Sequence, residues 1–263
     1  MTTKEKIKKS QINRELDEFQ IRNIKILTHL LEHNAVSDDI VDNLHKSELD
    51  YYSVMYKYNL LEKNANIDEK TNLLRFNNNY LTNIIKTASR IYHGLKDHKY
   101  NISLVRLDID DFSKFNNEHG HDVGDKVLIH IADILRNTSR PTDFVIRYGG
   151  EEFDLLLPST DIAQAEIILK KIFNKINNSH VECEGKKLKV TLSAGASLYV
   201  FKLEGNKIVN NKTIQKEFKN LQAQADNALY EAKFLGKNRY CFYDDSKKDE
   251  YEKIRDQYSK KLY

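Results

Sequence analysis

Two adjacent carboxylates follow a pair of glycines in residues 147–153, which read Arg-Tyr-Gly-Gly-Glu-Glu-Phe. Apolar, β-rich runs flank this stretch at 144–146 and 155–157, a pattern that predicts a β-hairpin. Both glycines can take the positive φ that a tight primed turn demands. Because successive strand residues face opposite sides, Glu151 and Glu152 are expected to differ in role. Unpaired carboxylates beside apolar sequence are costly unless they are compensated, so a metal ion is the first hypothesis.

A further carboxylate, Asp108, stands near the end of a strand expected over 102–109. Val105, Leu107 and Ile109 point to one side of this strand and Asp108 to the other. If the strand lies beside the hairpin, Asp108 and Glu151 converge at one edge. Mg²⁺ generally takes one or two protein carboxylates together with substrate phosphates. Such a pair could hold two ions about 4 Å apart for in-line displacement at phosphorus.

Other polar groups suit a nucleotide. Backbone amides in the loop expected at 111–114 could cradle phosphate oxygens. Asn116 and Asp125 offer an amide and a carboxylate, which together match the edge of guanine. Lys233 and Lys237, four residues apart at the end of the last strong helix, could neutralise a triphosphate. Each group alone has a more ordinary explanation, such as a strand-end cap, a solvated hairpin tip or a basic helix C-terminus.

Two regions of different composition must position these groups. Residues 1–66 contain no glycine or proline and carry apolar residues at helical spacing, including a short heptad seam at 12, 16, 19, 23, 26 and 30. We expect an α-helical N-terminal region there. Two interpretations stay open: a helical hairpin packed on its own chain, or a dimerisation and input element.

In the rest of the chain, segments with the apolar spacing of helices alternate with segments typical of strands. This order predicts an α+β sheet domain with helices laid on it. Helices are expected at about 77–95, 123–136, 161–177 and 221–234, and strands at 102–109 and 240–243. A second hairpin is expected over 181–192, turning at Glu184 and Gly185, and a further turn at 205–206. The charged tail from 246 is expected to be a solvated helix or disordered.

The amino-acid composition and the net charge limit the class of protein. Lys and Arg (42) against Asp and Glu (39) leave a formal charge of +3, which is too even to indicate nucleic acid as a partner. Cys183 and Cys241 have no metal-ligand spacing and indicate a reducing compartment. Residues 1–9 carry no signal-peptide pattern, and no window approaches the roughly 18 apolar residues of a membrane span. We therefore expect a cytoplasmic protein.

Several blocks in a fixed order carry a resemblance to a known family. The first reads Asp-Ile-Asp-x-Phe-x-x-Phe-Asn from Asp108 and ends in Gly-Asp at Asp125, and the second is 147–153. Supporting blocks lie at 68–73, 191–195, 225–233 and 236–238. Together they closely resemble the GGDEF family of diguanylate cyclases over about 67–243. We accordingly expect a helical region at 1–66, a GGDEF domain at 67–245 and a charged tail at 246–263.

The resemblance implies a ferredoxin-like sheet of the nucleotidyl-cyclase and polymerase-palm type. It implies condensation of two GTP into cyclic di-GMP with loss of two pyrophosphates, by a homodimer in which each domain binds one GTP. Two Mg²⁺ or Mn²⁺ ions per active site would be held by Asp108, the carbonyl of Ile109 and Glu151. Glu151 or Glu152 would assist deprotonation of the 3′-hydroxyl. The implied nucleotide-binding residues are Phe112, Ser113, Asn116, Asp125, Lys233 and Lys237.

The family's product-inhibition motif, R-x-x-D, has a counterpart in Arg140 and Asp143. Arg offers a fork for a phosphate or a guanine edge, and Asp accepts from guanine N–H groups. Elsewhere the chain departs from the family pattern: Ser113 stands where lysine is usual, and Lys237 where arginine is common. Two rival functions remain, a catalytically silent domain that senses cyclic di-GMP and a structural adaptor whose function lies in 1–66.

Overall fold

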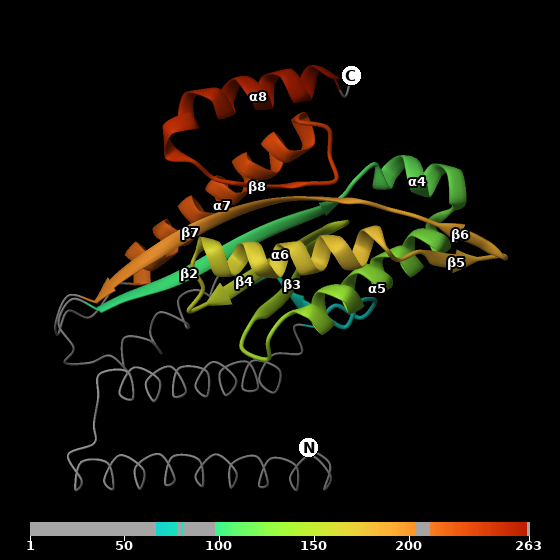
Figure 1. Cartoon of the computed structure of the whole chain (residues 1–263), viewed down its shortest axis with the longest axis horizontal. Helices are drawn as coiled ribbons and strands as arrows, with labels where there is room; N and C mark the ends of the chain where they lie inside the picture. The colour runs from blue at the N-terminus through green and yellow to red at the C-terminus, as the bar shows by residue number, and fades with distance from the viewer. Residues whose placement is uncertain (1–66, 78–79, 81–97, 204–210, 262–263) are drawn as a thin grey trace, which may run out of the picture. The chain divides into compact units, whose positions relative to one another are not determined.

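The computed structural model describes residues 67–77, 80, 98–203 and 211–261 (Figure 1). The N-terminal helical region expected at 1–66, nearly all of the helix expected at 77–95 and the turn expected at 205–206 lie outside the described residues. Among the described helices, none is long and apolar enough to cross a membrane.

A six-stranded sheet in the order β1-β3-β4-β2-β7-β8 forms the centre of the described domain (Figure 1). The four inner strands are antiparallel neighbours, and each edge strand pairs in parallel with the strand beside it. The strands are β1 (Leu74–Arg75), β2 (His98–Ile109), β3 (Phe144–Gly149), β4 (Glu152–Pro158), β7 (Leu192–Leu203) and β8 (Tyr240–Phe242). Strand β2 is therefore bonded on both sides, to β4 and β7.

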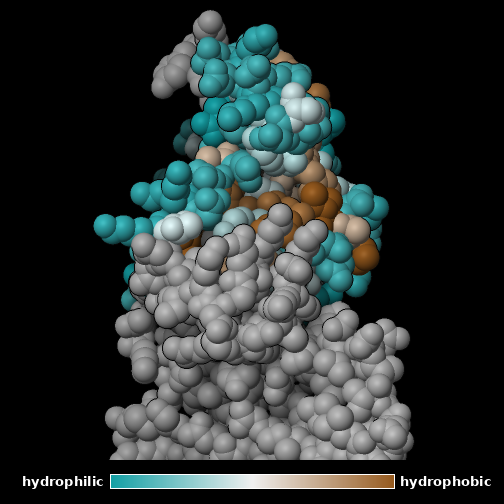
Figure 2. All heavy atoms as spheres, turned by 90° about the vertical axis from the view of Figure 1, so that its left-hand side faces the viewer, coloured by the Kyte–Doolittle hydropathy of each residue, from teal (hydrophilic) through white to brown (hydrophobic). Residues whose placement is uncertain are grey.

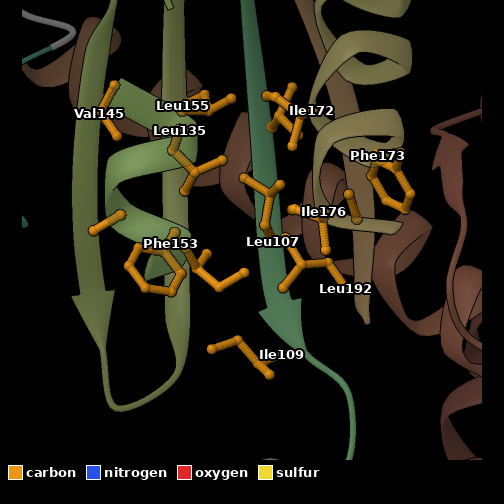
Figure 3. Packing of buried hydrophobic residues seen from close by; sticks show 14 of the residues in the cluster. Leu107, Ile109, Leu135, Val145, Phe153, Leu155, Ile172, Phe173, Ile176 and Leu192 are labelled. Carbon is orange, nitrogen blue, oxygen red and sulfur yellow. The ribbon is translucent and has the colours of Figure 1, made fainter. Parts of the chain in front are cut away.

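The core of the sheet has ferredoxin-like topology. The chain runs β2–α5–β3–β4–α6–β7, and these strands stand in the order β3-β4-β2-β7. Helices α5 (His121–Thr138) and α6 (Ile162–Asn177) bury their apolar sides in one cluster with Val105, Leu107 and Ile109 of β2 (Figure 3). Because side chains alternate along a strand, Arg106 and Asp108 face the other side of the sheet. The predicted α+β, palm-type architecture is confirmed.

Helix α7 (Asn211–Phe234) covers that other side and touches the sheet with its backbone. A Cβ on Gly195 of β7 would lie 2.0 Å from the carbonyl oxygen of Ala225 and 2.1 Å from the amide nitrogen of Leu229. No side chain fits between strand and helix at this point. The close approach brings the C-terminal end of α7, with Lys233, to the end of β2 that carries Asp108.

The second hairpin is confirmed as β5 (Val181–Cys183) and β6 (Lys186–Leu188), which pair only with each other among the described strands. Its two turn residues, Glu184 and Gly185, both have positive φ, 49° and 76°. This is the combination that a type I′ turn requires.

The charged C-terminal segment is a helix with one buried side. It follows a short 3₁₀ turn, η1 (Asp245–Lys247), as α8 (Lys248–Lys261) and packs against α7. Tyr251 and Ile254 are buried, and the Tyr251 hydroxyl accepts a hydrogen bond from the amide of Asp244 at 3.0 Å. The outer surface of α8, uppermost in Figure 2, is mainly hydrophilic, whereas hydrophobic side chains gather below it. The segment was expected to be either a solvated helix or disordered. The structure has the helix, and its buried side is the correction.

Three further elements differ from the expectations. Strand β7 was not predicted, although it pairs with β2 along all twelve residues of both strands. The expected loop at 111–114 opens a helix, α4 (Phe112–His119). Helix α7 begins at Asn211, ten residues before the predicted start at 221.

Replacing Gly195 with alanine should destabilise the domain, since the added methyl meets the backbone of α7 and cannot be accommodated by a side-chain rotation. We expect a loss of at least about 3 kcal/mol in the free energy of unfolding, measured by urea denaturation. Gly149→Ala is the matched control, because nothing lies within 4 Å of its Cβ position. Equal stability of the two variants would contradict direct packing of α7 on β7.

Candidate active site

The glycine pair and the carboxylates form a tight turn between β3 and β4, here called the signature turn (residues 149–152). Gly149 pairs with Glu152, so Gly150 and Glu151 are the two turn residues. Only Gly150 has positive φ, 49°, whereas both glycines were expected to be able to adopt it. Arg147 stabilises the turn by donating from Nη2 to the Gly150 carbonyl at 2.8 Å and by pairing with Asp68 at 2.8 Å.

The signature turn meets the end of β2 as the sequence predicted. Asp108 stands directly opposite Glu152 in the β2–β4 register, and the amide of Ile109 donates to the carbonyl of Glu151 at 3.4 Å. Asp108 is buried, with 8% of its surface exposed. Burial raises the pKa of Asp108, Lys233 opposes the rise, and the negative charge of Glu151 adds to it. The carboxylates of Asp108, at the end of β2, and of Glu151, in the turn, therefore lie close enough to repel each other.

Lys233 supplies the positive charge nearest to this group. Its Nζ lies 2.8 Å from Oδ1 of Asp108, and both side chains are largely removed from solvent. The lysine was expected to bind phosphate, and the structure brings it to the same place as the acidic pair. A triphosphate drawn to Lys233 would thus lie beside Asp108.

Glu152 lies in a different environment from Glu151. Burial raises the pKa of Glu152, the charge of Arg106 lowers it, and Asp108 raises it again. A carboxylate whose pKa is raised towards neutrality is suited to accept a proton at ordinary pH. Arg106 was missed by the sequence analysis, although its position on the same side of the strand as Asp108 could have revealed it.

The donor set fits a hard divalent cation. Asp108, Glu151 and the carbonyl of Ile109 supply only oxygen, the donor that Mg²⁺ and Mn²⁺ prefer. Within the described residues no three or more His, Cys, Asp or Glu side chains form a metal-binding group. Two carboxylates alone leave coordination positions for water and for the phosphates of a substrate, as is usual for Mg²⁺.

Asp110 is the carboxylate that this cation would not use. Its oxygens accept hydrogen bonds from the hydroxyls of Thr191 and Ser193, both at 2.6 Å, and from the amide of Asn238 at 3.0 Å. It ties the end of β2 to β7 and to the segment after α7. No site role was predicted for Asp110, and its place in the Asp-Ile-Asp block was the available signal.

The expected phosphate loop is the N-terminus of α4. Asp111 precedes the helix with φ 55°, and no side chain caps the first-turn amides. Phe112 is buried and Ser113 is exposed. Lys237 reaches this end of the helix, with Nζ 2.6 Å from Oδ1 of Asp111. Free amides, a helix dipole and a lysine at one place favour an anion.

The two residues expected to recognise guanine lie at the corner between α4 and α5. The side-chain oxygen of Asn116 is buried and has no hydrogen-bond partner. It lies so close to Gly124 that a Cβ there would come within 1.9 Å of it. Asp125 follows Gly124 and pairs with Lys70, a partner that was not predicted. A buried amide oxygen without a hydrogen-bond partner favours a ligand that supplies N–H groups.

The R-x-x-D pair has a local structural role. Asp143 is fully buried, and its carboxylate accepts from the backbone amide of Arg140 at 2.7 Å. The amide of Asp143 in turn donates to the carbonyl of Arg140 at 3.0 Å. Arg140 is exposed. The guanidinium is thus available to a ligand, whereas the Asp143 carboxylate, expected to accept from guanine, is turned onto its own loop.

Comparison with known proteins places this geometry in a family. The family model described as "Diguanylate cyclase, GGDEF domain" matches residues 65–239. Diguanylate cyclase A of Treponema denticola is 30% identical over 208 residues, which cover 74% of this chain and 53% of that protein. The chain spans about half of the length of Diguanylate cyclase A, and less than half of another curated relative that it matches.

Solved structures show the same fold. Diguanylate cyclase SiaD of Pseudomonas aeruginosa, solved in complex with its activator SiaC, is 25% identical with a TM-score of 0.55, covering 91% of this chain and 85% of that one. The GGDEF domain of DgcB from Caulobacter crescentus, in complex with c-di-GMP, is 24% identical with a TM-score of 0.56, covering 70% and 96%. The second likeness concerns the fold alone.

Replacing Asp108 with asparagine should stabilise the fold at neutral pH. The folded pKa of Asp108 is raised, so its ionised form destabilises the fold, and that cost grows as pH rises through the folded pKa. Below the unfolded pKa both states are protonated and the effect vanishes. We expect the free energy of unfolding of Asp108→Asn to exceed that of the wild type at pH 7 and to match it near pH 3. Asp256→Asn, an exposed position on α8, is the control, and a less stable Asp108→Asn at pH 7 would refute the repulsion.

Proposed function

We propose that this chain, which belongs to the GGDEF domain family of diguanylate cyclases, condenses two GTP molecules into cyclic di-GMP and two pyrophosphates. The observation that carries the proposal is the register of β2 on β4, which sets Asp108 opposite Glu152 and bonds Ile109 to Glu151. Family membership alone would allow a domain that has lost catalysis. An intact acidic turn that meets a buried carboxylate favours an active one.

Asp108, Glu151 and the carbonyl of Ile109 would hold two Mg²⁺ or Mn²⁺ ions. When bound, such ions polarise the phosphoryl oxygens and lower the pKa of the attacking hydroxyl. The chain itself supplies the charge arrangement around them. Lys233 at Asp108 and Lys237 at the N-terminus of α4 offset the negative charge of a triphosphate. The uncapped amides of α4, with Phe112 and Ser113 in its first turn, would donate hydrogen bonds to the terminal phosphates.

Guanine would be read at the corner between α4 and α5. Asn116 offers an amide oxygen that has no partner, and Asp125 offers a carboxylate to N–H groups. A site built to satisfy such groups discriminates against a base that lacks them. Asp125 would exchange Lys70 for the base on binding.

Glu152 is our choice for the group that assists deprotonation of the 3′-hydroxyl. Its raised pKa suits a proton acceptor, whereas Glu151 would serve the cation. Each domain would bind one GTP, so the second nucleotide must come from a facing copy in a homodimer. The proposed N-terminal region 1–66, ahead of a catalytic domain at 67–245, would set the geometry of that dimer.

The product would also inhibit through the loop at 140–143. The exposed guanidinium of Arg140 can bind a phosphate or a guanine edge, and Asp143 fixes the shape of the loop that presents it. Direct recognition by Asp143 would require its buried carboxylate to leave the Arg140 amide.

Incubation of the purified chain with GTP and Mg²⁺ should release pyrophosphate and yield cyclic di-GMP. Glu151→Gln should lower turnover at least about 100-fold, because it removes a charged oxygen ligand, while the circular dichroism spectrum stays unchanged. Glu252→Gln, exposed on α8, is the control and should retain activity. Binding of cyclic di-GMP without any pyrophosphate release would instead support a silent sensor domain.

Arg140→Ala should relieve product inhibition without lowering the initial rate. The expected result is an increase of at least about tenfold in the cyclic di-GMP concentration that halves the rate, because the paired charge-assisted hydrogen bonds of the guanidinium are lost. The measurement is the initial rate against added product, with the exposed Lys171→Ala on α6 as control. An inhibition curve identical to the wild type would exclude this loop as the regulatory site.

A further inference from the structure

A buried charge lies beneath the signature turn, and the proposed chemistry does not use it. Arg106 on β2 is 6% exposed and donates from Nε and Nη2 to the two carboxylate oxygens of Asp154 on β4, at 2.9 and 3.0 Å. Asp154 is 1% exposed. A bidentate pair of this kind fixes the plane of the guanidinium, which a lysine could not do.

The same guanidinium packs against the strand that leads into the turn. Its Cζ lies 3.9 Å from the ring centroid of Tyr148. Tyr148 is the extra residue of the β-bulge between Arg147 and Gly149, so its position sets where the following turn begins. Phe76 contacts the ring edge-on with centroids 4.7 Å apart. Arg106 therefore joins both strands of the signature hairpin, β4 through Asp154 and β3 through Tyr148.

A line of alternating charges connects Arg106 to the C-terminal helix. Oδ1 of Asp226 on α7 lies 3.7 Å from Nη1 of Arg106, and Oδ2 accepts from Nη2 of Arg255 on α8 at 2.6 Å. Arg255 also lies over the ring of Tyr230, 5.1 Å from its centroid. Two arginines and two aspartates thus alternate from α8 to the hairpin. Loss of Arg255 would leave Asp226 paired with Arg106 alone. Asp226 would then pull the Arg106 guanidinium away from the Asp154 carboxylate and from the Tyr148 ring.

We infer that Arg106 is a positioning residue for the signature turn and that α8, through Arg255 and Asp226, holds it in place. The expected effect of this coupling on the reaction rate rests on the proposed cyclase function. Helix α8 lies outside the site and would then influence the signature turn through Arg255. The base and phosphate contacts proposed for α4 and α5 do not pass through these residues, so loosening the turn should lower the rate more than the affinity for GTP.

The structural test is hydrogen–deuterium exchange of the full chain, followed in peptides that cover 146–153. In Arg255→Ala and in Asp226→Asn, the amides of the turn should exchange at least about threefold faster, because the bulge is no longer fixed. Lys253→Ala removes the same charge from an exposed position of the same helix and should leave exchange in 146–153 unchanged. Arg255→Lys should restore part of the protection. Unchanged exchange in the turn of Arg255→Ala, or an equal effect of Lys253→Ala, would overturn the inference.

The kinetic test separates positioning from general destabilisation. Arg255→Ala should lower kcat about threefold and Arg106→Lys about tenfold, with KM for GTP within about twofold of the wild type. In the double variant of Asp226→Asn and Arg255→Ala, the loss should equal that of Asp226→Asn alone, since Arg255 acts through Asp226. Additive losses would contradict the relay. A wild-type chain that releases no pyrophosphate would refute the proposed function, and the exchange measurement would still decide the coupling of α8 to the turn.

Discussion

Repulsion between carboxylates that share a poorly hydrated place is the constraint on which the site depends. Asp108 lies at the end of β2 and Glu151 in the signature turn, and the pairing of Asp108 with Glu152 in the sheet register holds the turn beside Asp108. Lys233 offsets part of the repulsion at Asp108, and Arg106 does the same at Glu152. A fold selected only for stability would not keep such a group. The arrangement becomes favourable when a cation and an anionic substrate bind together, because the cation offsets the charge of the carboxylates and the substrate phosphates offset the charge of the lysines.

The sheet keeps this polar group apart from the core that stabilises the domain. Alternation along β2 sends Leu107 and Ile109, together with Val105, into the apolar cluster under α5 and α6 (Figure 3). Arg106 and Asp108 lie on the opposite side of the strand. There α7 lies directly on the strand at Gly195, which places Lys233 at the end of β2. Asp110 fixes the same end through Thr191, Ser193 and Asn238. The positions of the charges thus follow from packing of the backbone rather than from flexible side chains.

Much of this arrangement was predictable from local sequence, and the failures have physical reasons. The hairpin around Gly150 and the meeting of Asp108 with the turn followed from glycine content and from strand alternation. Strand β7 was missed because its centre, Ser193 to Ser197, consists of small residues that carry no β-branched signal. Gly195 at its middle lies directly against the backbone of α7. Helix α4 was taken for a loop because it is polar and rich in Asn. Among the residues of α8 whose burial the structure describes, two are buried, Tyr251 and Ile254, which are too few for periodicity to reveal. Arg106 and Asp154 form a tertiary pair 48 residues apart, which no local pattern reports.

Binding of Mn²⁺ in the presence of 3′-deoxy-GTP, followed by electron paramagnetic resonance, tests most directly whether Asp108 and Glu151 grip a cation together with the triphosphate. This nucleotide keeps the phosphates and the base but cannot form the new bond. We predict that Mn²⁺ binds the wild-type chain with the nucleotide and that its affinity falls at least about tenfold when either carboxylate is replaced by its amide. Mn²⁺ affinity that is the same in the wild type and in both amide variants would contradict the account.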